Sequence, residues 1–108
     1  MKKTITTIIV DDESNSIATL SKDLENYPEI QIIETTTSVE KAKKIIVQHQ
    51  PDLLFLDIEM PKMNGFELLH EIRTLIHSEM YIVFYSAYDK YVLEALRSSA
   101  FDYLTLLS

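Results

Sequence analysis

The sequence predicts an α/β fold built on a doubly wound parallel sheet, and three observations support this prediction. Short apolar runs alternate along the chain with segments whose hydrophobic residues recur at helical spacing. The run Leu53–Leu56 is apolar at every position, as in strands that are buried on both faces of a parallel sheet. The segment Ile30–Thr35 is rich in β-branched residues, which strands prefer. Strands that alternate with helices imply right-handed βαβ units with helices on both faces of the sheet.

The first half of the chain is expected to form two strands and two helices. A strand at Thr4–Val10 precedes a helix that Pro28 stops, and the apolar stripe of this helix comprises Ile17, Leu20, Leu24 and Tyr27. The second strand is Ile30–Thr35. Ser38 is expected to cap the second helix, whose apolar stripe comprises Val39, Ala42, Ile45 and Ile46.

The second half begins with the third strand, Leu53–Leu56. Asn64 and Glu67 have the spacing of a capping box, which predicts that a third helix opens there. The apolar stripe of this helix comprises Phe66, Leu69, Ile72 and Ile76. The remaining predicted elements are a strand at Tyr81–Tyr85, a helix from about Asp89 and a strand at about Asp102–Leu106.

The composition narrows the class of protein. A chain of 108 residues is long enough for one domain with a single core. The net charge of −7 argues against direct nucleic-acid binding, which needs a basic surface. The chain has no Cys, so it has no disulfides and no zinc–thiolate site, which fits a cytoplasmic protein. The apolar run Ile8–Val10 is too short for a signal peptide or a membrane span.

Polar side chains stand where the predicted strands end. Asp11 and Asp12 follow the first strand, Asp57 follows the third, and Ser86 follows the fourth. Because the carboxyl ends of parallel strands meet at one edge of a sheet, we expect these side chains to share a crevice. Carboxylates that lie so near each other repel unless a cation lies between them. Mg²⁺ prefers oxygen ligands of this kind. The sequence therefore predicts an Mg²⁺ site at which one carboxylate attacks a phosphoryl group, with Ser86 placed to hydrogen-bond it.

A simpler interpretation of these acids is that they cap the helices that follow the strands. The joint presence of Asp57 and Ser86 at matching strand ends favours the site. The loop before the third helix adds Pro61 and Gly65, the only glycine of the chain. That rarity indicates a backbone requirement at position 65, either a positive φ or a close approach of the loop.

Four segments with these residues form a combination that covers the whole chain in order and spacing: Val10–Glu13, Leu56–Pro61 with Gly65, Ser86–Asp89 and Ala100–Leu104. This combination resembles the receiver domain of two-component response regulators. The segment Ala87–Leu96 looks most like receivers joined to LytTR-type DNA-binding output domains. The resemblance implies a flavodoxin-like fold, with five parallel strands in the order 2-1-3-4-5.

The resemblance also implies roles for single residues. Asp57 would be the phosphoacceptor and would bind Mg²⁺ together with Asp12. Asp11 would assist directly or through water, and the backbone carbonyl of Glu59 would supply a further ligand. Ser86 and Tyr103 would be the switch residues.

The end of the chain departs from the family pattern. Leu106 stands where the family usually has a lysine that pairs with the phosphoryl group. Leucine supplies neither charge nor donor, so we expect impaired phospho-switching. We expect residues 1–108 to form a receiver domain that stops before the family's fifth helix. Apolar surface left uncovered there would favour a homodimer or an exchanged C-terminal segment.

The leading hypothesis is therefore a cytoplasmic signalling switch. A histidine kinase or phosphotransfer protein would phosphorylate Asp57, and an output domain would lie outside this chain. We expect no enzymatic activity beyond self-phosphorylation from small donors and slow self-dephosphorylation. The alternatives are a pseudo-receiver that only docks proteins, favoured by Leu106, and a phosphatase of the haloacid-dehalogenase type. The phosphatase is disfavoured because the nucleophile follows the third strand rather than the first.

Overall fold

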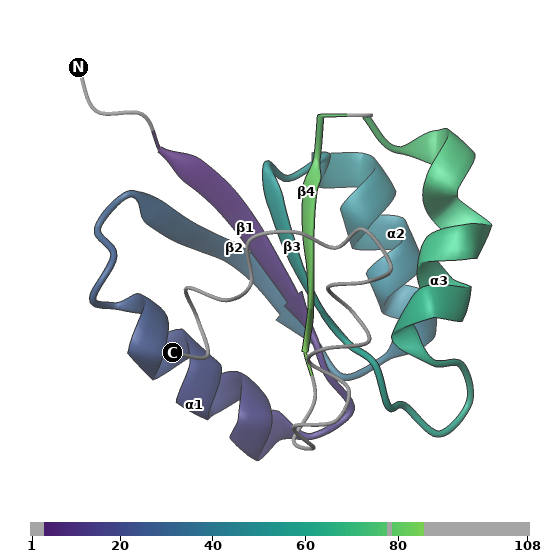
Figure 1. Ribbon diagram of the computed structural model, residues 1–108, viewed down its shortest axis with the longest axis horizontal. Coiled ribbons are helices and arrows are strands. Elements are labelled where there is room, and N and C mark those ends of the chain that lie inside the picture. The colour runs from purple at the N-terminus through teal and green to yellow at the C-terminus, as the bar shows by residue number, and fades with distance from the viewer. Residues whose placement is uncertain (1–3, 78, 86–108) are drawn as a thin grey trace.

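A computed structural model describes residues 4–77 and 79–85 of the chain. Within them, a parallel sheet consists of β1 (Ile5–Val10), β2 (Ile30–Thr36), β3 (Leu53–Asp57) and β4 (Tyr81–Tyr85). The strand order is β2-β1-β3-β4, which agrees with the predicted doubly wound, flavodoxin-like sheet (Figure 1). The predicted fourth helix and fifth strand lie outside the described residues.

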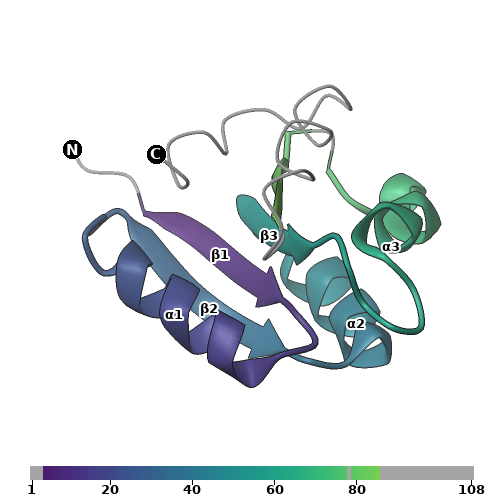
Figure 2. The same ribbon diagram turned by 60° about the horizontal axis from the view of Figure 1, so that its bottom comes forward.

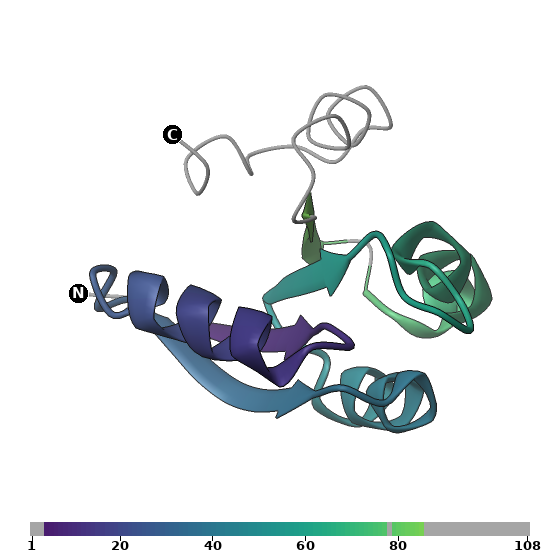
Figure 3. The same cartoon turned by 90° about the horizontal axis from the view of Figure 1, so that it is seen from below.

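Three helices cover the sheet: α1 (Ser14–Leu24), α2 (Val39–His49) and α3 (Gly65–Ile72), the last extended by a 3₁₀ turn, η1 (Arg73–Leu75). Across the sheet, the connection from β1 to β2 runs toward one edge, and the connections from β2 to β3 and from β3 to β4 run toward the opposite edge. Right-handed crossovers therefore place α1 on one face and both α2 and α3 on the opposite face, as Figure 3 shows. In the described part of the chain, none of the helices has the length and apolar character that crossing a membrane requires.

The core lies between the central strands and the helices. The most deeply buried apolar strand residues are all at most 1% exposed, and they are Ile8, Ile9, Val10, Leu54, Phe55 and Leu56. Full burial of each such side chain contributes about 1.5–3 kcal/mol relative to exposure. The predicted burial of the third strand on both faces is confirmed, although Leu53 at its start is half-buried. This rigid centre carries the ends of β1 and β3.

The first helix ends earlier than the sequence predicts. α1 stops at Leu24, so Tyr27 lies outside the helical stripe and is 43% exposed. Its backbone N–H donates to the carbonyl of Leu24 at 3.0 Å, which closes a turn after the helix. Pro28 therefore follows the turn rather than the last helical residue.

The third helix also ends before Ile76, which the sequence analysis places in its stripe. Ile76 has extended backbone, with φ −118° and ψ 158°. The Gln50 side chain explains this end, because its amide donates to the carbonyl of Leu75 and accepts from the N–H of His77, both at 2.9 Å. These backbone groups thus bond to a distant side chain instead of continuing the helix.

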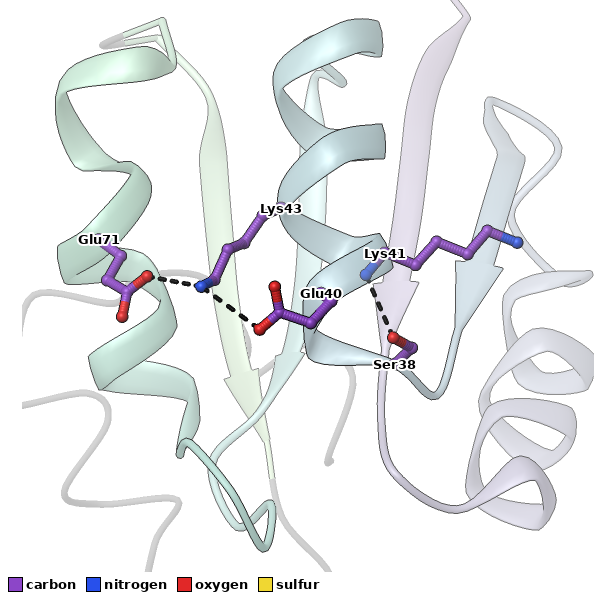
Figure 4. Close-up of polar contacts among 5 residues, drawn as sticks. All are labelled: Ser38, Glu40, Lys41, Lys43 and Glu71. Carbon is purple, nitrogen blue, oxygen red and sulfur yellow. Dashed lines mark hydrogen bonds and ion pairs between the residues drawn. The ribbon is translucent and has the colours of Figure 1, made fainter.

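Polar contacts fix the start of α2 and join it to α3 (Figure 4). The predicted cap is confirmed, since the Ser38 hydroxyl accepts a hydrogen bond from the backbone N–H of Lys41 at 3.1 Å. Lys43 Nζ lies 2.7 Å from a Glu71 oxygen of α3 and 3.7 Å from a Glu40 oxygen of its own helix. The hydrogen bond to Glu71 is the main cause that raises the pKa of Lys43. The pair therefore links the two helices that share one face of the sheet.

Candidate metal and phosphate site

Three carboxylates meet at the carboxyl edge of the sheet. Asp11 and Asp12 directly follow β1, and Asp57 is the last residue of β3. The two strands are neighbours with Val10 paired to Leu56, and their ends lie next to each other in Figure 2. One carboxylate oxygen from each acid lies within 4.8 Å of the others. The structure therefore brings together the three acids that the sequence predicts to share a crevice.

Backbone donors orient the two buried acids. Asp11 and Asp57 are only 3% and 6% exposed, whereas Asp12 is exposed. The N–H of Glu13 donates to Oδ1 of Asp11 at 2.9 Å, and the N–H of Glu59 donates to Oδ1 of Asp57 at 3.1 Å. Each bond spans two residues, which is the pattern of an Asx turn. The turns after β1 and β3 thus hold both side chains at the edge of the sheet.

The environment of Asp57 strongly disfavours a lone negative charge. Burial, and to a lesser extent the neighbouring Asp11 carboxylate, raises the pKa of Asp57 from 3.8 to about 8. The hydrogen bond from Glu59 opposes this rise. A cation beside the acids would reverse the effect, because it favours the ionised form. Three carboxylates of this kind fit Mg²⁺, a hard ion that binds one or two carboxylates and completes its shell with water or phosphate.

A depression at the surface opens beside Asp12. Its lining consists of Asp12, Ile58, Glu59, Met60, Pro61 and Asn64. Most of these residues belong to the loop between β3 and α3, which includes the predicted Pro61. The depression thus gives a ligand in solution access to the exposed member of the acid cluster.

Gly65 fits the site because its backbone lies very close to that of Asp57. A Cβ atom at position 65 would lie 2.5 Å from the carbonyl oxygen of Asp57. The N–H of Gly65 also donates to the carbonyl of Ile58 at 3.0 Å. Of the two predicted reasons for this glycine, close approach is confirmed, whereas positive φ is wrong because its φ is not positive. The capping box of Asn64 and Glu67 is also confirmed.

Tyr85 belongs to the site, although the sequence analysis gives it no role. Its hydroxyl donates to Oδ2 of Asp11 at 2.7 Å. Burial and this hydrogen bond raise the pKa of the Tyr85 hydroxyl, so it remains a donor. Its position at the end of the fourth strand, directly before Ser86, is the signal that could have indicated its presence at this edge. Ser86, Tyr103 and Leu106 themselves lie outside the described residues.

The fold and the acid cluster define the class of the domain: a doubly wound, flavodoxin-like α/β domain with three acids clustered at the carboxyl edge of its sheet. Residues 7–105 match the family described as Response regulator receiver domain. The chain belongs to this family.

Curated relatives and solved structures agree with this assignment. An uncharacterized response regulatory protein of Vibrio cholerae is 38% identical over 105 residues, which cover 96% of this chain and 40% of that protein. The sensory transduction protein LytT of Enterococcus faecalis is 36% identical over 97 residues, with 90% and 40% covered. The response regulatory domain of mrkE from Klebsiella pneumoniae matches with a TM-score of 0.73 at 26% identity, with 90% and 79% covered. The chain thus spans about 40% of the length of these curated relatives.

The raised pKa of Asp57 predicts how stability depends on pH in the absence of metal. Between 3.8 and about 8, the folded state holds a proton on Asp57 that the unfolded chain releases. The free energy of unfolding should therefore fall as the pH rises through this window, by at most about 1.4 kcal/mol per pH unit from this group. Asp57→Asn should weaken this dependence of the free energy of unfolding on pH. Near the upper end of the pH window, the metal-free variant should therefore be more stable than metal-free wild type.

Urea unfolding in a chelator across this pH range measures the effect. Asp23→Asn, which removes an exposed carboxylate from α1, is the matched control and should keep the wild-type slope. Parallel curves for wild type and Asp57→Asn would contradict the assignment.

The contact of Gly65 predicts a cost for any side chain at this position. Gly65→Ala should lower the free energy of unfolding by about 1–3 kcal/mol, because the new methyl group forces the backbone of Asp57 to move. Thr19→Ala, at an exposed position of α1, should change it by less than about 0.5 kcal/mol. Urea unfolding of both variants is the measurement, and a Gly65→Ala protein as stable as wild type would show that the approach is not close.

Proposed function

We propose that this chain is a phospho-accepting receiver module that uses Mg²⁺ as its cofactor. The observation that carries the proposal is the meeting of Asp11, Asp12 and Asp57, whose carboxylate oxygens lie within 4.8 Å of one another. Membership of the receiver family supports it. The phosphoryl donor in this proposal is a phosphohistidine of a histidine kinase or phosphotransfer protein.

Asp57 is the nucleophile of the proposed reaction. A carboxylate oxygen of Asp57 forms a bond to phosphorus while the phosphorus–nitrogen bond of the donor histidine breaks, and the imidazole leaves with the electron pair. Asp12, Asp57 and the backbone carbonyl of Glu59 would hold Mg²⁺, with Asp11 acting directly or through water. When bound, Mg²⁺ offsets the negative charge of the acids and of the phosphoryl group. The hydrogen bond from Glu59 N–H orients the attacking carboxylate.

The output of the module follows from charge added at Asp57. A phosphoryl group provides strong hydrogen-bond acceptors that bias nearby segments between two arrangements. Ser86 and Tyr103 are the proposed switch residues. Leu106 offers no charge to the phosphoryl group, so the switch is weaker than in receivers that have lysine there. A pseudo-receiver that docks proteins without switching is the second candidate, and Leu106 is the residue that favours it.

The output domain and the cellular compartment of the module are also part of the proposal. The LytT proteins of Enterococcus faecalis and Bacillus cereus are 36% and 37% identical to this chain and extend well beyond the matched region. This similarity supports an output domain of the LytTR DNA-binding type outside this chain. The net charge of −7 supports a domain that does not itself bind nucleic acid. A receiver that meets a kinase and a DNA-binding domain would work in the cytoplasm.

Phosphorylation by a small donor tests the proposal. Incubation with acetyl phosphate and Mg²⁺ should add one phosphoryl group to the wild-type chain and none to Asp57→Asn, because the amide cannot attack phosphorus. Intact mass spectrometry at early times measures the product. Asp52→Asn, directly before β3 begins, is the control and should be labelled like wild type.

Two results would count against the proposal. Equal labelling of wild type and Asp57→Asn would remove Asp57 from its role. Full labelling without any change in the amide NMR spectrum outside the acid cluster would favour the pseudo-receiver instead.

A further inference from the structure

The hydrogen bond between Tyr85 and Asp11 joins strands that are not neighbours. β3 lies between β1 and β4, and Tyr85 pairs in register with Asp57 at the end of β3. Adjacent strands are about 4.8 Å apart, so the Tyr85 side chain, its hydrogen bond and the Asp11 side chain together bridge about two strand spacings. A serine or threonine is too short for this distance, and a phenylalanine lacks the donor. The contact therefore depends on a long side chain with a donor at its end, which Tyr85 supplies.

This contact completes the hydrogen bonding of a deeply buried carboxylate. Asp11 is 3% exposed, its Oδ1 accepts from the N–H of Glu13 at 2.9 Å, and its Oδ2 accepts from the hydroxyl of Tyr85 at 2.7 Å. With one donor on each oxygen, the side chain is held facing Asp57. A carboxylate oxygen has two lone pairs, so each oxygen can still face a cation or a water that is bound to it.

The Tyr85 hydroxyl differs from the other hydrogen-bond donors to the acid cluster. In the part of the chain that the structure describes, Asp11 and Asp57 accept hydrogen bonds from the N–H groups of Glu13 and Glu59 and from the Tyr85 hydroxyl. The first two are backbone groups that any residue would supply. Tyr85 alone of these three is a side chain, so it alone can adjust the site through the choice of residue.

We propose that Tyr85 is a positioning residue of the metal centre, which fixes Asp11 opposite Asp57 and thereby strengthens the binding of Mg²⁺. The inference rests on the Mg²⁺ site of the proposed function and adds a residue to it. Hydrogen-bond partners of metal-binding carboxylates orient them, and their loss typically weakens metal binding by about 10–100-fold. Since Asp11 keeps its bond from Glu13 when Tyr85 is replaced, the lower end of this range applies.

A titration of the whole chain with Mg²⁺ tests the inference. The signal is the backbone amide of Gly65, the only glycine, whose backbone lies beside Asp57. Tyr85→Phe keeps the ring and removes the hydroxyl, so it should raise the dissociation constant for Mg²⁺ by about tenfold. Tyr81→Phe is the matched control: Tyr81 begins the same strand, is 59% exposed, and its replacement should change the constant by less than about twofold.

A double variant separates positioning from a general structural effect. Asp11→Asn keeps the size of the side chain and an acceptor for Glu13, but removes the charge that the Tyr85 hydroxyl orients. In this background, Tyr85→Phe should weaken Mg²⁺ binding by less than about twofold. A ring that merely supports the fold would instead weaken binding equally in both backgrounds.

The outcomes distinguish this inference from the proposed function. Unchanged or tighter Mg²⁺ binding by Tyr85→Phe, or an equal loss in both backgrounds, overturns the role of Tyr85 and leaves the proposed function standing. Absence of Mg²⁺ binding by the wild-type chain at millimolar concentration overturns both. Urea unfolding of Tyr85→Phe in a chelator shows whether the variant is folded, and Tyr85→Leu, which also lacks the hydroxyl, should weaken binding at least as much.

Discussion

The parallel pairing of β1 with β3 forces negatively charged groups together, and the rest of the site responds to that constraint. Val10 and Leu56 are partners in this ladder, so the residues that follow them emerge side by side. Burial of Asp57 near Asp11 makes its ionised form unfavourable, which the pKa of about 8 expresses. Such an arrangement lowers the stability of the metal-free chain as the pH rises from 3.8 to about 8. A cation beside the acids would offset this cost, because it favours the ionised carboxylates.

The surrounding residues hold the acidic side chains at the edge of the sheet. Asx turns at Glu13 and Glu59 and the hydroxyl of Tyr85 supply donors to the buried acids. Gly65 lets the first turn of α3 approach the backbone of Asp57. This close contact holds the loop between β3 and α3 beside the acids. The acids thus lie at the ends of two strands whose apolar residues are buried in the core. Pre-organisation of this kind means that little has to move when a ligand binds.

Much of this arrangement can be predicted from local patterns in the sequence. The apolar run of β3, the capping box at Asn64 and the acids at strand ends are short-range signals, and the structure agrees with each. Contacts between distant residues are harder to predict. Gln50 hydrogen-bonds to Leu75 and His77 at the end of the 3₁₀ turn η1, and Tyr85 reaches Asp11 across an intervening strand. Neither contact leaves a periodic or motif signal, because each depends on the register and twist of the assembled sheet.

The proposed metal site is tested most directly by locating a divalent ion in a crystal grown with Mn²⁺, an oxygen-seeking substitute for Mg²⁺ that scatters anomalously. One strong anomalous peak is expected at the carboxyl edge of the sheet, within about 2.3 Å of carboxylate oxygens of both Asp12 and Asp57. A map without a peak there, or side chains of Asp12 and Asp57 that point into separate regions, would contradict the proposed site.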